Sequence, residues 1–206
     1  MPSARELVQI ISSGRGLKGF GCAINGATVK PFDFSAKDFL SFAFEDLKNS
    51  SHRGIVNTLS NVKRSIDCRI EELLFCYCLQ VKSKREHWDI PKKLEILAEI
   101  GILAPKILRR ISTLRNRLEH QFEKPHLEKV EDAVDVGELF LEATEKLCCP
   151  IANLNKGANF LITFRRYENE IELQDGSLKR ALKIGSEDDW LTIAKLLVAK
   201  RKDVMT

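Results

Sequence analysis

Residues 55–81 read IVNTLSNVKRSIDCRIEELLFCYCLQV, which is the longest periodic segment of the chain. Its apolar residues recur in alternating steps of three and four over roughly seven helical turns. The residues that form this stripe are Ile55, Leu59, Val62, Ile66, Ile70, Leu73, Tyr77 and Val81. From Leu73 to Leu79 the chain is apolar on all sides. The pattern predicts a long helix that packs at the centre of a helical bundle.

Further helices are predicted on both sides of this segment, from apolar periodicity and from residues that start or stop helices. They cover residues 4–12, 35–48, 89–101, 104–123 and 127–148. The start at Ser35 resembles a capping box, and Pro125 blocks continuation of the helix before it. A glycine-punctuated loop with one possible strand lies between the first two helices.

After Pro150 the apolar period changes from helical to alternating. Strands are predicted around residues 160–164, 171–173 and 178–184, followed by a last amphipathic helix. We expect a mainly α fold, a helical bundle with a small C-terminal β-hairpin or sheet and a terminal helix, α+β overall. The predicted units are an extension at 1–34, the bundle at 35–150 and the strand and helix element at 151–206.

The composition is that of an ordinary soluble protein, with 206 residues, 44% hydrophobic residues and a net charge of +4. Residues 1–13 lack the long apolar core of a signal peptide, and no apolar run is long enough to cross a bilayer. We therefore expect a cytoplasmic protein with no membrane partner. The six cysteines contain no Cys-x-x-Cys pair and are interpreted as reduced thiols. The four histidines form no metal-binding motif, so we expect no metal ion and no cofactor.

The stretch most informative about function is LRNRLEHQF at residues 114–122. On a helix, the apolar residues of this segment form one stripe, which is expected to face the core. The stripe consists of Ile107, Ile111, Leu114, Leu118 and Phe122, whereas Arg109, Thr113, Asn116 and His120 cluster on the opposite face. Arg115 lies at the edge of the stripe, about 140° around the helix from His120. A twofold copy of the helix would bring the two side chains together across an interface.

The same segment is basic. Between Ala104 and Pro125 there are six basic residues and two acidic ones, so the local net charge equals the +4 of the whole chain. Arginine binds phosphate through two parallel hydrogen bonds, and histidine can move protons near neutral pH. The alternative is ordinary helix chemistry, in which Arg115 pairs with Glu119 one turn later and the remaining charges are solvated.

Arg115-Asn116 followed by His120, late in a helix of an all-helical bundle, resembles the Arg-x4-6-His motif of the HEPN superfamily (higher eukaryotes and prokaryotes nucleotide-binding domain). The resemblance covers roughly residues 35–150. It implies metal-independent cleavage of RNA by a homodimer whose motif helices meet, as in toxins of toxin–antitoxin or antiviral systems. Carried over, Arg115 would stabilise charge on the scissile phosphate, His120 would act as general acid or base, and Asn116 would position the phosphate or the histidine.

One position departs from some toxin members of that superfamily. They carry a tyrosine two residues after the histidine, which a partner enzyme modifies, whereas Phe122 here has no hydroxyl group. Neutralisation by that kind of partner is therefore not expected. Further RNA-binding residues are predicted at Arg109, Arg110 and Arg117, and in the aromatic and basic run that contains Arg165 and Arg166. The alternative for that run is an ordinary strand with one buried face.

Two weaker patterns are interpreted as structural. Residues 14–19 match Gly-x-Gly-x-x-Gly, but a helical segment precedes them and a strand-like one follows, which is the reverse of a dinucleotide site. Glu71 and Glu72 are expected to be solvated. The alternative is that their carboxylates support the side chains of the Arg115–His120 motif.

The leading hypothesis is thus a HEPN-like endoribonuclease. The alternatives are a non-catalytic HEPN-like module that binds nucleotide, RNA or a regulatory protein, and a helical interaction protein whose motif is plain surface. An antitoxin or regulatory protein is a possible partner.

Overall fold

The structure is a computed structural model. Its helical part is described from Phe32 to Leu147 with short gaps, and its C-terminal part is described mainly in strands. The described residues are 20–21, 32–49, 51–77, 79–102, 107–121, 123, 125–145, 147, 153–155, 160–165, 170–175, 178–183, 191–192, 194–195 and 198. The helix predicted at residues 4–12 and the glycine motif at 14–19 lie outside these residues.

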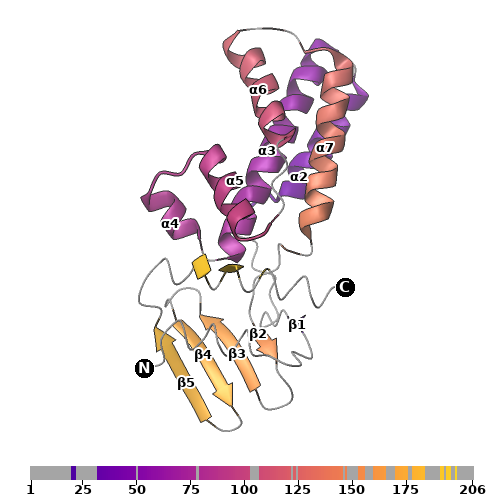
Figure 1. Ribbon diagram of the computed structural model, residues 1–206. Helices are drawn as coiled ribbons and strands as arrows, with labels where there is room; N and C mark the ends of the chain where they lie inside the picture. The colour runs from indigo at the N-terminus through magenta and orange to yellow at the C-terminus, as the bar shows by residue number, and fades with distance from the viewer. Residues whose placement is uncertain are drawn as a thin grey trace.

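The protein is mainly helical, as the sequence predicted (Figure 1). The helices are α2 (Ala36–Lys48), α3 (His52–Cys76), α4 (Gln80–Arg85), α5 (Ile90–Glu99), α6 (Ile107–His120) and α7 (Leu127–Glu145). Local chemistry fixes several of their starts. Ser35 and Asp38 form the predicted capping box of α2, and Asp89 caps α5 by accepting a hydrogen bond from the backbone N–H of Lys92 at 2.9 Å.

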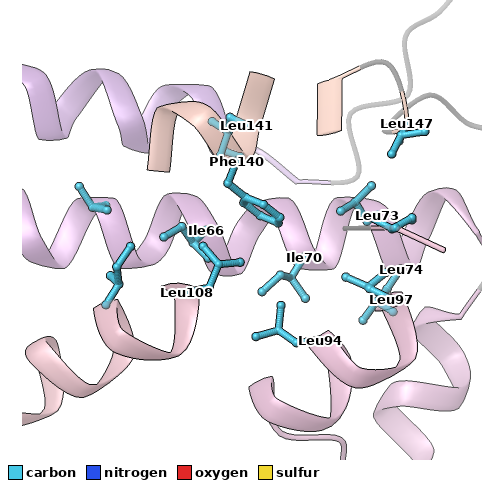
Figure 2. Packing of buried hydrophobic residues seen from close by; sticks show 14 of the residues in the cluster. Ile66, Ile70, Leu73, Leu74, Leu94, Leu97, Leu108, Phe140, Leu141 and Leu147 are labelled. Atoms are coloured by element: carbon cyan, nitrogen blue, oxygen red, sulfur yellow. The ribbon is translucent and has the colours of Figure 1, made fainter. Parts of the chain in front are cut away.

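Helix α3 forms the centre of the bundle and contacts α2, α4, α5, α6 and α7. Figure 2 shows its apolar side chains between those of the neighbouring helices. Ile70, Leu73 and Leu74 of α3 are fully buried, and they lie among Leu97 of α5 and Phe140 of α7. The long central helix predicted from the apolar stripe is confirmed.

The predicted helix is wrong at its C-terminal end. The stripe was expected to continue to Val81, but α3 ends at Cys76 and a separate helix, α4, begins at Gln80. The backbone N–H of Leu79 reaches back to the carbonyl of Leu74 at 2.8 Å, which turns the chain and buries Leu79. Val81 is then 75% exposed. Apolar spacing alone does not distinguish a continuing helix from one that turns and restarts.

The other two long predicted helices are shorter than expected at their ends. Helix α6 ends at His120 rather than at Glu123, and α7 ends at Glu145 rather than at Cys148. In α6 the chain leaves the helix through hydrogen bonds from the backbone N–H groups of Gln121 and Glu123 to the same carbonyl, that of Arg117. Residues 103–106, where the predicted start of α6 lies, are outside the described residues.

The strands form one antiparallel sheet in the order β1-β2-β3-β4-β5. Their bounds are β1 (Phe20–Gly21), β2 (Asn153–Asn155), β3 (Phe160–Arg165), β4 (Glu170–Asp175) and β5 (Leu178–Lys183). The register places Ile162 opposite Leu173 and Phe164 opposite Ile171. Figure 1 shows this sheet beyond the end of the bundle that is opposite to the α6–α7 connection. Among the described residues, no helix is both long enough and apolar enough to cross a membrane.

The turn between α2 and α3 depends on close backbone approach at Gly54. A Cβ atom at Gly54 would lie 1.9 Å from the carbonyl oxygen of Asn49 and 2.7 Å from that of Asp46. Both are main-chain atoms, so neither can move aside without displacing the end of α2. The backbone N–H of Gly54 also donates to the Ser51 hydroxyl at 3.1 Å, which holds the first turn of α3 in place.

We therefore expect Gly54→Ala to lower the free energy of unfolding by about 1–3 kcal/mol, the usual cost of forcing extra atoms into a packed site. The measurement is chemical denaturation followed by circular dichroism. Arg53→Ala is the matched control, because Arg53 is exposed and next to Gly54. Equal stability of the two variants would show that the turn has room for a methyl group.

Candidate functional site

Helix α6 packs on the bundle through one apolar stripe. Leu108 and Ile111 are buried, and Leu114 and Leu118 are partly buried against the core. Figure 2 shows Leu108 close to Ile66 of the central helix α3. The predicted inward direction of Ile111, Leu114 and Leu118 is thus confirmed. The other two members of the predicted stripe, Ile107 and Phe122, have side chains outside the described part of the structure.

The outer side of α6 carries Thr113, Arg117 and His120, all of which are exposed. These residues follow each other in steps of four and three, so they lie along one face of the helix. The exposure predicted for Thr113 and His120 is confirmed. His120 is the last residue of α6, where the chain turns away through Gln121. Its imidazole is therefore accessible at the end of the helix, while the stripe of the same helix is held against α3.

Arg115 and Asn116 belong to α6, but their side chains lie outside the described part of the structure, as do those of Arg109 and Arg110. Helix geometry places the backbone of Arg115 about 7.5 Å before His120 along the axis and about 140° around it. Asn116 comes one turn before His120 on the same side. Within one chain, the helix therefore brings Asn116 near His120 and holds the backbone of Arg115 on another side.

The second predicted group of RNA-binding residues lies in the sheet. Arg165 ends β3 and is opposite Glu170 of β4 in the register, and Glu170 is in turn opposite Lys183 of β5. Arg166 lies outside the described residues. Since strand β3 and the C-terminal end of α6 are at opposite ends of the molecule in Figure 1, Arg165 does not complete the α6 site within one chain.

A buried cluster of charges lies where α2, α3 and α7 meet. Arg69 of α3 is 4% exposed, and it pairs with Glu72 at 3.4 Å and with Glu145 of α7 at 3.0 Å. Glu72 is also buried and accepts the backbone N–H of Ala36 at 3.0 Å, at the first turn of α2. The expectation that Glu72 is solvated was wrong, because its carboxylate is the partner of both a buried guanidinium and a helix N-terminus.

Glu145 closes this cluster toward solvent, where Lys37 of α2 pairs with it at 2.9 Å. Burial acts to raise the pKa of the Glu145 carboxyl group, but the hydrogen bonds and charges of Lys37 and Arg69 outweigh it, so the pKa is lowered from its ordinary value of 4.5. The cluster ties three helices together by charge. It lies on the α2–α7 side of α3 and, among the described side chains, includes none from α6, so we assign it to the fold rather than to the α6 site.

Two further observations limit the chemistry. Among the described residues, no group of three or more His, Cys, Asp or Glu side chains is placed to hold a metal ion. The sulfur atoms of Cys68 and Cys76 are not in disulfide bonds.

The sequence matches no family model, no curated protein and no solved structure. The HEPN resemblance therefore rests on the Arg115–His120 motif and its helical setting, and the function that it implies stays a proposal.

We expect Glu145→Gln to lower the thermal unfolding midpoint at pH 7 and to have little effect near pH 3. A carboxyl group whose pKa is lowered on folding contributes stability above its unfolded pKa, and the contribution is lost as the pH falls through the folded pKa. The measurement is thermal unfolding of both proteins across this pH range. Glu142→Gln, an exposed position one turn earlier in α7, removes the same charge and is the control. A midpoint difference that is independent of pH would contradict the assignment.

Proposed function

We propose that this protein is a metal-independent endoribonuclease of the HEPN type, which acts in the cytoplasm as a toxin or an antiviral defence component. The observation that carries the proposal is the position of His120. It is exposed at the end of α6, in the sequence context of the Arg-x4-6-His motif, while the apolar stripe of the same helix is anchored on α3. A proton-transfer group at a fixed, accessible point is what cleavage of an RNA backbone needs.

The proposed reaction is attack of a ribose 2′-hydroxyl on the adjacent phosphorus. The bond from phosphorus to the 5′ oxygen breaks, which leaves a 2′,3′-cyclic phosphate and a 5′-hydroxyl. His120 moves a proton either from the 2′-hydroxyl or to the departing 5′ oxygen, and solvent water supplies or accepts the proton of the other transfer. Arg115 stabilises the negative charge that develops on the phosphate oxygens, and Asn116 positions the phosphate or the histidine. No step requires a metal ion or a cofactor.

The site is proposed to be shared by two copies of the chain. In one copy, about 140° of rotation separates Arg115 from His120. Two α6 helices related by a twofold axis would place the arginine of one copy opposite the histidine of the other. The basic residues Arg109, Arg110 and Arg117 would then line the path of the RNA backbone on both sides, where arginine binds phosphate well. Arg117 is exposed, as this role requires.

The separation of Arg115 and His120 within one chain also supports a second candidate function. A HEPN-like module whose arginine and histidine stay apart would bind RNA, a nucleotide or a regulatory protein without cleaving anything. Such a module would bind RNA in a saturable and salt-dependent manner because basic side chains replace counterions on the phosphates. Cleavage products distinguish the two functions. Under either function, an antitoxin or another regulatory protein is a possible partner.

We expect His120→Ala to reduce cleavage of a single-stranded RNA by about 10²–10⁴-fold, the usual contribution of a general acid or base. The thermal unfolding midpoint should be unchanged, because the side chain is exposed. The measurement is the rate of fragment formation by purified protein in the presence of a chelator, with the termini of the products identified by mass spectrometry.

His126→Ala is the matched control for this experiment. It also removes one exposed histidine, but one that lies in the α6–α7 connection outside the motif. Wild-type protein that binds RNA and leaves every RNA intact would favour the non-catalytic module. Equal cleavage by H120A and H126A would exclude His120 from the reaction.

A further inference from the structure

A pocket separate from the α6 motif lies near the C-terminal end of the central helix, α3. A pocket of about 450 Å³ opens where the C-terminal part of α3 meets α4 and α5. This volume is within the range of roughly 300–1,000 Å³ found for small-molecule sites. Its lining includes Glu71, Ser83, Lys84, His87, Trp88 and Lys93, and no described residue of α6 contributes to it.

The charges around the pocket favour an anion. Lys93 donates to Glu71 at 2.5 Å, so these two side chains balance each other. Lys84 and His87 are exposed at the pocket, and neither pairs with an acidic side chain among the described residues. A ligand with a phosphate group would therefore meet two unpaired basic side chains at the wall formed by the end of α4.

The remaining lining suits a flat ring with polar edges. Phe32 and the buried Trp88 both contribute apolar wall to the pocket, and the indole Nε1 of Trp88 donates to Glu86 at 2.8 Å, which fixes the ring. Gln80 adds a side-chain amide, which can both donate and accept hydrogen bonds. An inorganic anion alone would leave the apolar wall and the amide without a role.

His87 is held in the pocket wall by an unusual backbone conformation. It follows the end of α4 with a φ of 52°, and the backbone N–H of Trp88 reaches the carbonyl of Ser83 at 3.0 Å while that of His87 reaches Lys84 at 3.3 Å. These are the two hydrogen bonds of a Schellman cap, a position where glycine costs least because a Cβ atom is crowded at positive φ.

Helix α5 ends with the same motif and shows the contrast within the same protein. There Gly101, with a φ of 92°, occupies the equivalent position, and Ile102 and Gly101 donate to Leu97 and Ala98 at 2.8 and 3.0 Å. The cap after α4 thus carries a strained histidine where the cap after α5 carries glycine. Strain of this kind at a pocket wall is a feature of binding sites.

We propose that this pocket binds a nucleoside phosphate, with the phosphate on Lys84 and His87 and the base against Phe32 and Trp88. The ligand is either a free mononucleotide or one nucleotide of a single-stranded RNA. This site is separate from the motif on α6 and does not depend on cleavage there. The pocket would be a second RNA-binding site, or it would make the activity of the protein depend on the concentration of a free nucleotide.

The test measures binding of nucleoside monophosphates by quenching of Trp88 fluorescence in a Trp190→Phe background, with isothermal titration calorimetry as a second readout. We expect saturable binding, weakened at least about tenfold by Lys84→Ala and by His87→Gly, because each loses a hydrogen bond to a charged group. His87→Gly should keep or raise the thermal unfolding midpoint, since glycine relieves the strained cap. A loss of binding in that variant is therefore not explained by unfolding.

Arg85→Ala is the control, because Arg85 is an exposed basic residue of α4 that pairs with Glu86 and does not line the pocket. A second arm uses a short single-stranded RNA in a His120→Ala background, which prevents the proposed cleavage. Binding of the monophosphate identifies the free nucleotide as a ligand. Binding of RNA alone identifies the strand, provided that His87→Gly weakens RNA binding by the same factor of about ten or more. Unchanged affinity in K84A and H87G, no saturable binding in either arm, or equal competition by inorganic phosphate would overturn the proposal.

Discussion

The burial of α3 organises the whole helical bundle. Ile70, Leu73 and Leu74 are completely inaccessible to solvent, and five other helices contact this one segment. Each surrounding helix needs only one apolar stripe, because α3 supplies the opposite surface for all of them. The chemistry of the bundle is consequently confined to the outer faces of the surrounding helices and to the two ends of α3.

The buried charges of Arg69 and Glu72 fix the positions of α2 and α7 relative to α3. An apolar surface permits some sliding of α2 along α3, whereas the carboxylate of Glu72 binds one particular backbone N–H, that of Ala36. Arg69 compensates the charge of Glu72 and reaches Glu145 on α7, so the three helices share one fixed arrangement. Removing a single partner would leave a buried charge uncompensated, which is much more costly than losing an exposed ion pair.

The sequence predicted those parts of the fold that local chemistry decides. The capping box at Ser35, the cap at Asp89 and the glycine stop at Gly101 each act within a few residues. They can therefore be recognised from the sequence without knowledge of the tertiary structure. The end of α3 was not predictable in this way, since Val81 continues the apolar period and yet lies on the surface. The prediction that Glu72 is solvated was wrong for a related reason, because only the tertiary contact with Ala36 shows that Glu72 is buried.

The α6 motif and the pocket at His87 also differ in whether the sequence alone reveals them. The α6 motif was found from the sequence because an arginine and a histidine at fixed spacing in one helix form a recognisable pattern. The pocket at His87 was missed because its lining comes from four separate segments, and because a histidine in a Schellman cap has no local sequence signal. The strain at His87 is visible only in the backbone angles.

The packing of α6 also determines what its motif can do. Leu108 and Ile111 are buried, and Leu114 and Leu118 are packed against the core, so the helix cannot rotate about its axis without exposing this stripe. Helix geometry sets the angle of about 140° between Arg115 and His120, and the packed stripe fixes the orientation of the whole helix, so neither can adjust. A reaction that needs both groups on one phosphate must therefore bring the second group from elsewhere. A second copy of α6 is the source that requires no change in the packing of either chain, which is why catalysis and dimerisation form a single proposal.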